Sequence, residues 1–373
     1  MKTGIRKAIP SGAYLILVLW TALLIILTAV SGYAMTAKVL QNKMESVASH
    51  ELQLSPNFLE PGETVPEGVP PMGGKSQEPV NVFTGIYVDR ITELSFKESY
   101  WIVEFYVWFR WNGDSVQPGE NLQVIQGQIE SKVKEAESVQ GQNHYEEYRV
   151  LARITKHFDE SRFPRDDHLL TIQIEDTTNS SYQLCYEADV TDSGISNQVK
   201  VSGYEIYRTG TVVKLHTYDT DFGDPSFPAN CEDTYSQFTY GIWIARPDWG
   251  FYLKTFQGLF VAVLASMLAL LIRPSRAEPR FTLGVGALFA AVANTYITQS
   301  YLPNTGIMTL TDMVNGLSML TILLTLVQST ISLYLCEKRS KEKSTHLFDR
   351  VSLIVLFVGY VVINVMLPMV ASL

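Results

Sequence analysis

The fold of this chain is decided by residues 278–305, which read EPRFTLGVGALFAAVANTYITQSYLPNT. Residues 281–311 carry no charge, and this run is longer than the roughly 20 residues that a helix needs to cross a membrane. Helical steps of three or four from Thr282 place these side chains on one face: Gly286 (or Val285), Phe289, Ala293 and Tyr296. Asn294, Thr295, Thr298, Gln299 and Ser300 make the outer half polar. Polar side chains inside a membrane either face water in a pore or bond neighbouring helices, and both interpretations stay open here.

Four other charge-free runs accompany this one, at residues 8–37, 255–272, 313–336 and 351–373. The chain is 46% hydrophobic yet 18% charged, so its charges are segregated from these runs. A soluble protein rarely has so many long apolar helices. We expect an N-terminal transmembrane anchor at 1–37 and a four-helix transmembrane bundle at 249–373, with helices at about 249–272, 280–301, 308–336 and 349–371.

Basic residues beside the runs predict the orientation of a multi-pass protein of the plasma (inner) membrane. Three segments are rich in Lys and Arg: Lys2, Arg6 and Lys7; Arg273, Arg276 and Arg280; and Lys338, Arg339, Lys341, Lys343 and Arg350. The positive-inside rule places all three in the cytoplasm, so the N-terminus is cytoplasmic and residues 36–253 lie outside. The first run also resembles a removable signal peptide, but its apolar core is longer than usual, which favours a retained anchor.

The outer segment is predicted to be a β domain. Residues 38–79 contain many prolines and glycines and are typical of a linker. After them come short runs rich in β-branched and aromatic residues, at 81–92, 100–111, 148–156, 169–175, 205–217 and 236–245. We expect an all-β immunoglobulin-like sandwich over 80–248. The whole outer segment, residues 36–253, has a formal charge of −16, which argues against nucleic acid as a partner and leaves a cationic ligand or a metal ion possible.

Signatures of an enzyme are missing from the sequence. It has no phosphate-binding glycine loop, no paired-histidine zinc motif and no glycine-flanked serine, so we expect neither catalysis nor a cofactor. His168 at a strand start is more readily a structural histidine than a catalytic one. Cys185 and Cys231 both lie on the oxidising side and are a possible disulfide, whereas Cys336 lies at the cytoplasmic face.

Four stretches in order along the chain carry a family resemblance. They are WFRWNGD at 108–114, Phe163-Pro164-Arg165-Asp166, Arg246 ahead of the second apolar run, and residues 278–305 followed by Met308-Thr309. Together they resemble the pentameric ligand-gated ion channels, especially the bacterial members, over roughly residues 80–373. Lys156 and Leu170 stand where animal members carry the two cysteines of the Cys-loop, which bacterial members also lack.

The resemblance implies a homopentamer in membrane lipid, opened by a small molecule, proton or ion that acts on the outer domain. It implies a gating interface of Phe163, Pro164, Asp166, Arg246 and Pro303, with a charge-assisted hydrogen bond between Asp166 and Arg246. Family ligands lie between subunits in a box of aromatic side chains. By position the candidates are Trp108, Tyr182, Phe227 and Tyr235, each of which could instead pack within a strand.

The resemblance also gives roles to residues of the pore helix. Five copies of Glu278 are expected to form a cation-selecting ring at the cytoplasmic mouth, unless Glu278 is a surface residue paired with Arg276 or Arg280. Phe289 is expected to form a hydrophobic constriction, unless it packs between helices. Because Gly284 and Gly286 depart from the polar inner half of conducting members, the alternative is a non-conducting receptor or scaffold with the same fold.

Overall fold

The computed structural model describes residues 11–56, 78–218, 233–303, 306–339 and 342–372. They form two compact units. The first comprises Met1–Glu45, Glu160–Asp166 and Asp248–Leu373, and the second comprises Ser46–Asp159 and Asp167–Pro247. The short segment Glu160–Asp166 therefore belongs with the helices, although strands precede and follow it in the sequence.

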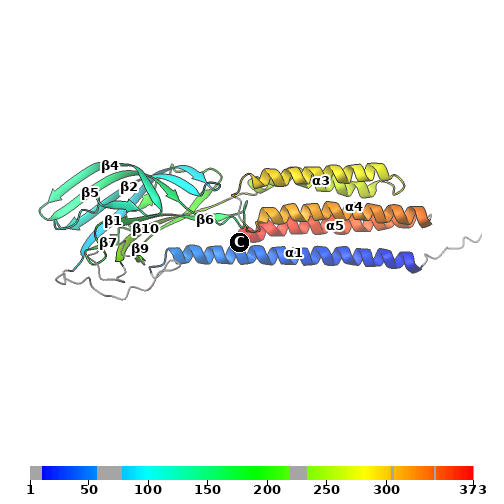
Figure 1. Ribbon diagram of the computed structural model, residues 1–373, viewed down its shortest axis with the longest axis horizontal. Helices are drawn as coiled ribbons and strands as arrows, with labels where there is room; N and C mark the ends of the chain where they lie inside the picture. The colour runs from blue at the N-terminus through cyan, green and yellow to red at the C-terminus, as the bar shows by residue number, and fades with distance from the viewer. Residues whose placement is uncertain (1–10, 57–77, 219–232, 304–305, 340–341, 373) are drawn as a thin grey trace, which may run out of the picture. The chain divides into compact units, whose positions relative to one another are not determined.

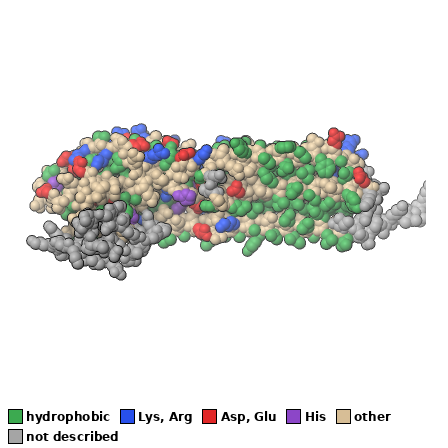
Figure 2. Space-filling view, in the orientation of Figure 1, with side chains coloured by type: hydrophobic (Ala, Val, Ile, Leu, Met, Phe, Trp, Pro, Cys, Tyr) green, Lys and Arg blue, Asp and Glu red, His purple; other side chains and the backbone are tan. Residues whose placement is uncertain are grey.

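The first unit is helical (Figure 1). Its elements are α1 (Ser11–Gln53, of which the last residues belong to the second unit), α2 (Gly250–Leu268) continued by a 3-10 turn η1 (Ala269–Leu271), α3 (Ala277–Gln299), α4 (Leu310–Arg339) and α5 (Glu342–Ser372). Among the described residues, these five α-helices are long and apolar enough to cross a membrane. Hydrophobic side chains cover much of their outer surface (Figure 2), as expected of helices in contact with lipid.

Two helix boundaries, the end of α1 and the start of α4, differ from the predicted ones, and each difference has a physical cause. α1 continues to Gln53, so residues 38–53 are helical and the prediction of a linker there is wrong. The first proline of that segment is Pro56, and nothing before it interrupts the helix. α4 begins at Leu310 because Thr309 and Asp312 cap it reciprocally, with the Asp312 amide 3.1 Å from the Thr309 hydroxyl.

Small side chains allow the membrane helices to approach closely. α3 packs against α2 and α4, and α5 packs against α4 and α2. α1 contributes Leu24 and Val39 to the same apolar core. On α5, a Cβ placed on Gly359 would lie 3.2 Å from Thr28 of α1, which shows how near these two helices come.

The second unit is a β-sandwich-like region of two sheets. Its strands are β1 (Val80–Ser95), β2 (Tyr100–Asn112), β3 (Leu122–Val124), β4 (Gly127–Gln140), β5 (Asn143–Thr155), β6 (Asp167–Asp176), β7 (Leu184–Ala188), β8 (Gly194–Ile195), β9 (Glu205–Tyr218) and β10 (Asp233–Ala245). The first sheet has the order β4-β5-β2-β1-β7, with β8 also paired to β1, and the second has the order β3-β6-β10-β9.

Alternation along the central strands builds the core between the sheets. In β2 the inward side chains Trp101, Val103, Phe105, Val107 and Phe109 are all fully buried. They pack against inward residues of the second sheet, so the hydrophobic core is shared by both sheets. All six predicted strand runs lie largely in observed strands. β4 was not predicted because its charged residues hide the apolar character of a strand. It is an edge strand, and charges on an edge discourage pairing with another chain.

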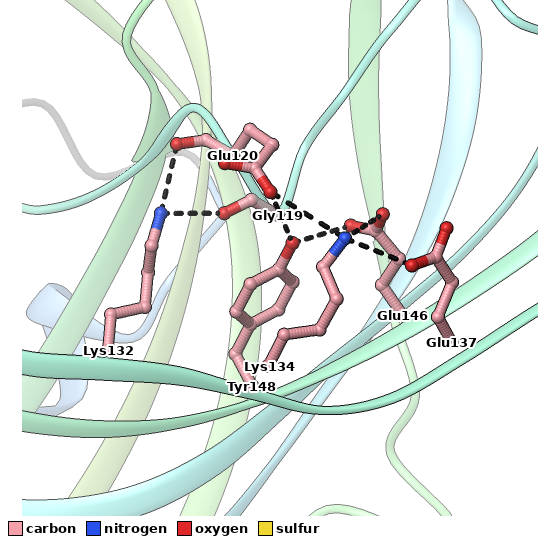
Figure 3. Close-up of polar contacts among 7 residues, drawn as sticks. All are labelled: Gly119, Glu120, Lys132, Lys134, Glu137, Glu146 and Tyr148. Carbon is pink, nitrogen blue, oxygen red and sulfur yellow. Dashed lines mark hydrogen bonds and ion pairs between the residues drawn. The ribbon is translucent and has the colours of Figure 1, made fainter.

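A polar cluster holds the turn before β3 against β4 and β5 (Figure 3). The Tyr148 hydroxyl and the Lys134 ammonium each lie 2.9 Å from the Glu146 carboxylate. Lys132 donates to the carbonyl oxygen of Gly119 at 3.0 Å. A Cβ on Gly119 would lie 2.1 Å from the Tyr148 ring, so only glycine lets the turn approach so closely.

Candidate functional site

The chain's own helices leave most of α3 uncovered, including the predicted pore-lining residues and also Leu283, Leu288, Val292 and Ile297. The buried residues of α3 are Arg280, Gly284, Ala287, Ala291 and Thr298. The predicted lining residues Thr282, Gly286, Phe289, Ala293 and Tyr296 are all exposed. Phe289 and Tyr296 are 72% and 79% exposed, which is a large apolar and aromatic surface for one chain to leave open.

The two glycines of α3 have different roles. A Cβ on Gly284 would lie 2.3 Å from Cδ2 of Leu326, so this glycine allows α3 and α4 to pack closely. A Cβ on Gly286 would meet nothing within 4 Å, since this residue belongs to the uncovered face. Conducting members of the family have a more polar residue where this chain has Gly284. In this chain, Gly284 serves the packing of α3 against α4 and does not belong to the exposed stripe.

Polar residues in the outer half of α3 divide between two roles. The amide of Asn294 donates to Asn315 of α4 at 3.1 Å, and Asn315 donates to the Thr298 hydroxyl at 3.0 Å. Thr295 bonds the carbonyl oxygen of Ala291 in its own helix. For Asn294 and Thr298, the structure supports hydrogen bonds to a neighbouring helix rather than exposure to water in a pore.

Glu278 and Arg280 point to different sides of α3. Glu278 is exposed, and its backbone carbonyl accepts a hydrogen bond from the Thr282 hydroxyl at 2.9 Å. Arg280 is buried and pairs with Asp349 of α5 at 2.5 Å. The alternative in which Glu278 pairs with Arg280 is therefore wrong. In the described part of the chain Glu278 makes no ion pair.

The segment Glu160–Asp166 is packed into the helical unit. The Phe163 ring meets the Phe251 ring of α2 edge to face, with centroids 5.8 Å apart. The Leu310 amide at the start of α4 donates to the carbonyl oxygen of Ser161 at 2.9 Å. Arg162 donates to the carbonyl oxygen of Ala371 at 3.1 Å. The segment thus contacts α2, α4 and the end of α5 together.

Other predicted interface residues lie as follows. The peptide bond from Phe163 to Pro164 is cis. Asp166, 1% exposed, belongs to the first unit. Arg246 belongs to the second unit, where its guanidinium carbon lies 4.2 Å from the centroid of the Tyr204 ring. The bond between Asp166 and Arg246 stays a prediction. Pro303 follows the end of α3, and the next two residues lie outside the described ranges.

An aromatic pocket opens on the outward face of the first sheet. It has a volume of about 440 Å³ and is lined by Tyr87, Tyr106, Trp108, Arg110, Tyr145, Glu147 and Asp192. The register explains the grouping, because Tyr87 is paired with Tyr106 and Trp108 with Glu147 on adjacent strands. Sequence reasoning found only Trp108. The alternation of β2 contained the signal for Tyr106, whereas Tyr87 and Tyr145 required the strand register.

One ion pair neutralises the arginine of this pocket. Arg110 donates to Asp189 at 2.5 Å, and the Trp108 indole donates to the same carboxylate oxygen at 3.2 Å. Burial, together with the hydrogen bond to Glu147, raises the pKa of Tyr145 to about 12. The Tyr145 hydroxyl is therefore neutral and donates to Glu147 at 2.9 Å. Since the cation of Arg110 is neutralised by Asp189, the lining leaves Glu147 and Asp192 as net negative charges.

The remaining aromatic candidates lie in other parts of the second unit. Tyr235 is in β10 and meets Tyr218 of β9 edge to face at 5.7 Å. The Tyr218 hydroxyl donates to the buried Glu175 at 2.9 Å. Tyr182 is partly exposed in the turn before β7. Phe227 lies outside the described residues. Trp108 and Tyr235 therefore belong to different sheets and do not form one box within a single chain.

Cys185 and His168, two further residues of the sequence predictions, lie in the described ranges. Cys185 is in β7 and burial raises the pKa of its thiol, while Cys231 lies outside the described residues, so their pairing stays a prediction. His168 is 2% exposed, with its ring centroid 5.0 Å from that of Phe96, which is the environment of a packed core histidine.

Over the described ranges, no group of three or more His, Cys, Asp and Glu side chains could hold a metal ion.

No protein-family model matches this chain, and no curated protein matches it.

Proposed function

We propose that this chain is the subunit of a homopentameric, ligand-gated, cation-selective channel of the plasma (inner) membrane. In this proposal α2–α5 form the four-helix pore domain, α3 lines the pore, and the outer domain is an immunoglobulin-like sandwich outside the cytoplasm. The observation that carries the proposal is the exposure of the whole stripe from Thr282 to Tyr296 on α3. Around a fivefold axis this stripe would face the water-filled pore and the neighbouring copies.

The composition of α3 supports the same proposal. Over an 18-residue window, the mean hydropathy of α3 is 1.4, against 1.7 for α2, 1.8 for α4 and 2.5 for α5. A helix that lines water needs less apolar surface than one that faces lipid on its open side. Exposed Phe289 side chains from five copies would narrow the pore with apolar rings, and an apolar constriction blocks ions by excluding water.

The aromatic pocket supports a cationic ligand. Tyrosine and tryptophan faces attract cations, and the lining adds the carboxylates of Glu147 and Asp192. Trp108 in the first sheet and Tyr235 in the second are separate within one chain, so a ligand could contact both groups only from neighbouring copies. An organic cation is accordingly the ligand class that we propose.

Electrophysiology of the purified full chain in lipid vesicles fused to a planar bilayer tests the proposal. We expect discrete unitary currents with a reversal potential that favours cations under a salt gradient. Glu278→Gln should move this potential toward zero, because it removes the carboxylate ring. Folded pentamers that never conduct, with or without candidate organic cations, would favour the non-conducting receptor or scaffold instead.

A further inference from the structure

A fully buried charged cluster joins all four C-terminal helices next to the beginning of α3. Arg280 is 1% exposed and Asp349 of α5 is 0% exposed, and their side chains are 2.5 Å apart. The Arg280 guanidinium also donates twice to the carbonyl oxygen of Ile272, at the end of the α2–η1 segment, at 2.5 and 3.0 Å. These bonds use Nε and one terminal nitrogen and hold the guanidinium in one direction, while the other terminal nitrogen, Nη1, is buried without a hydrogen-bond partner among the described residues.

The carboxylate of Asp349 is equally committed. One oxygen receives Arg280. The other accepts a hydrogen bond from the amide of Gln328 at 3.0 Å and one from the hydroxyl of Ser332, both from α4. Charge-assisted hydrogen bonds of this kind are the strong ones, and both carboxylate oxygens are used.

The direction of Arg280 matters because Glu278 lies only two residues away. Two residues correspond to about 200° around a helix, so the two side chains leave α3 on nearly opposite sides. Glu278 is on the exposed side and Arg280 on the side packed against α2, α4 and α5. A guanidinium cannot lose its charge in a protein, so burying it requires a negative partner.

We infer that Asp349 is a determinant of charge selectivity in the pore, although it does not line the pore. It is a positioning residue: it holds five copies of Arg280 inside the subunits, so that the ring of Glu278 carboxylates is the charge presented at the pore mouth. Without Asp349, the guanidinium of Arg280 loses its counter-ion and is driven toward the aqueous mouth, where it opposes Glu278. The inference rests on the proposed function.

Reversal potentials of the full-length protein under a KCl gradient test this inference. Asp349→Asn should lower the permeability ratio of K⁺ over Cl⁻ severalfold, and adding Arg280→Gln to it should restore the ratio. Arg280→Gln alone should leave the ratio unchanged, because the wild-type guanidinium contributes no charge to the pore. Arg350→Gln is the matched control, since Arg350 is the next residue of α5 and is exposed.

Each result decides the question. An unchanged ratio in Asp349→Asn, with Glu278→Gln shifted as expected, would overturn the inference and leave the proposed function standing. If Asp349→Asn gives no pentamer, Arg280→Gln decides: an unchanged ratio supports the inference, and a stronger cation preference shows that Arg280 faces the pore and overturns it. If the wild-type protein does not conduct, the proposed function fails first and the inference fails with it.

Discussion

The hydroxyl of Thr311, in the first turn of α4, donates a 3.0 Å hydrogen bond to the backbone carbonyl oxygen of Phe163. The donor residue is 1% exposed, so the bond is shielded from water. It fastens the segment Glu160–Asp166 to the helix that follows the predicted pore lining. Any movement of this segment must therefore move α4 or break the bond.

Thr311→Val keeps the shape of the side chain and removes the donor. We expect a loss of about 0.5–1.5 kcal/mol, the net value of one buried hydrogen bond, measured as a lower unfolding temperature of the detergent-solubilised protein. Thr330→Val is the control, because the Thr330 hydroxyl is exposed and bonds only a carbonyl oxygen of its own helix. Equal shifts for the two variants would mean that the bond to Phe163 has no special role.

Gly284 and Gly286 offer a matched pair on α3. Gly284→Val should cost about 1–3 kcal/mol through overpacking, because its Cβ position is already 2.3 Å from Leu326. Gly286→Val should leave the unfolding temperature of the separated subunit almost unchanged. Adding Leu326→Ala to Gly284→Val should restore part of the loss. If Leu326→Ala worsens it, the two side chains do not compete for the same space.

Asp166 and Arg246 should be energetically coupled. Replacing either residue by a neutral isostere should destabilise the protein more than replacing both, with a coupling energy of about 0.5–3 kcal/mol in a double-mutant cycle. The exposed pair Glu51 and Arg208, 2.6 Å apart, is the control and should give about 0–1 kcal/mol. Additive effects of Asp166→Asn and Arg246→Gln would refute the predicted bond.

Phe289→Ala should raise the current that flows without ligand, because it widens an apolar constriction that excludes water. Unitary recordings in lipid bilayers give the measurement. Phe357→Ala provides the control, since Phe357 is exposed on α5, away from the α3 stripe. Loss of pentamers without a leak current would instead mean that Phe289 packs between subunits.

The outward face of the first sheet shows why a ligand site is hard to derive from sequence. Trp108 could be selected as a candidate by its position along the chain, from the family resemblance. Tyr87, Tyr106 and Tyr145 come from three strands, and only the register places them around one pocket. Strand pairing joins residues far apart in the chain, and nothing local specifies which residues become neighbours.

By itself the sequence determined the classes of structure and their order: five long apolar helices and a region of alternating strands between the first helix and the second. These follow from local patterns, because charge-free length and periodicity act residue by residue. Only the tertiary structure decided that Glu160–Asp166 packs with the helices, and that Arg280 pairs with Asp349 of α5. Those outcomes depend on buried polar groups finding partners on distant segments, and burial is a property of the assembled core.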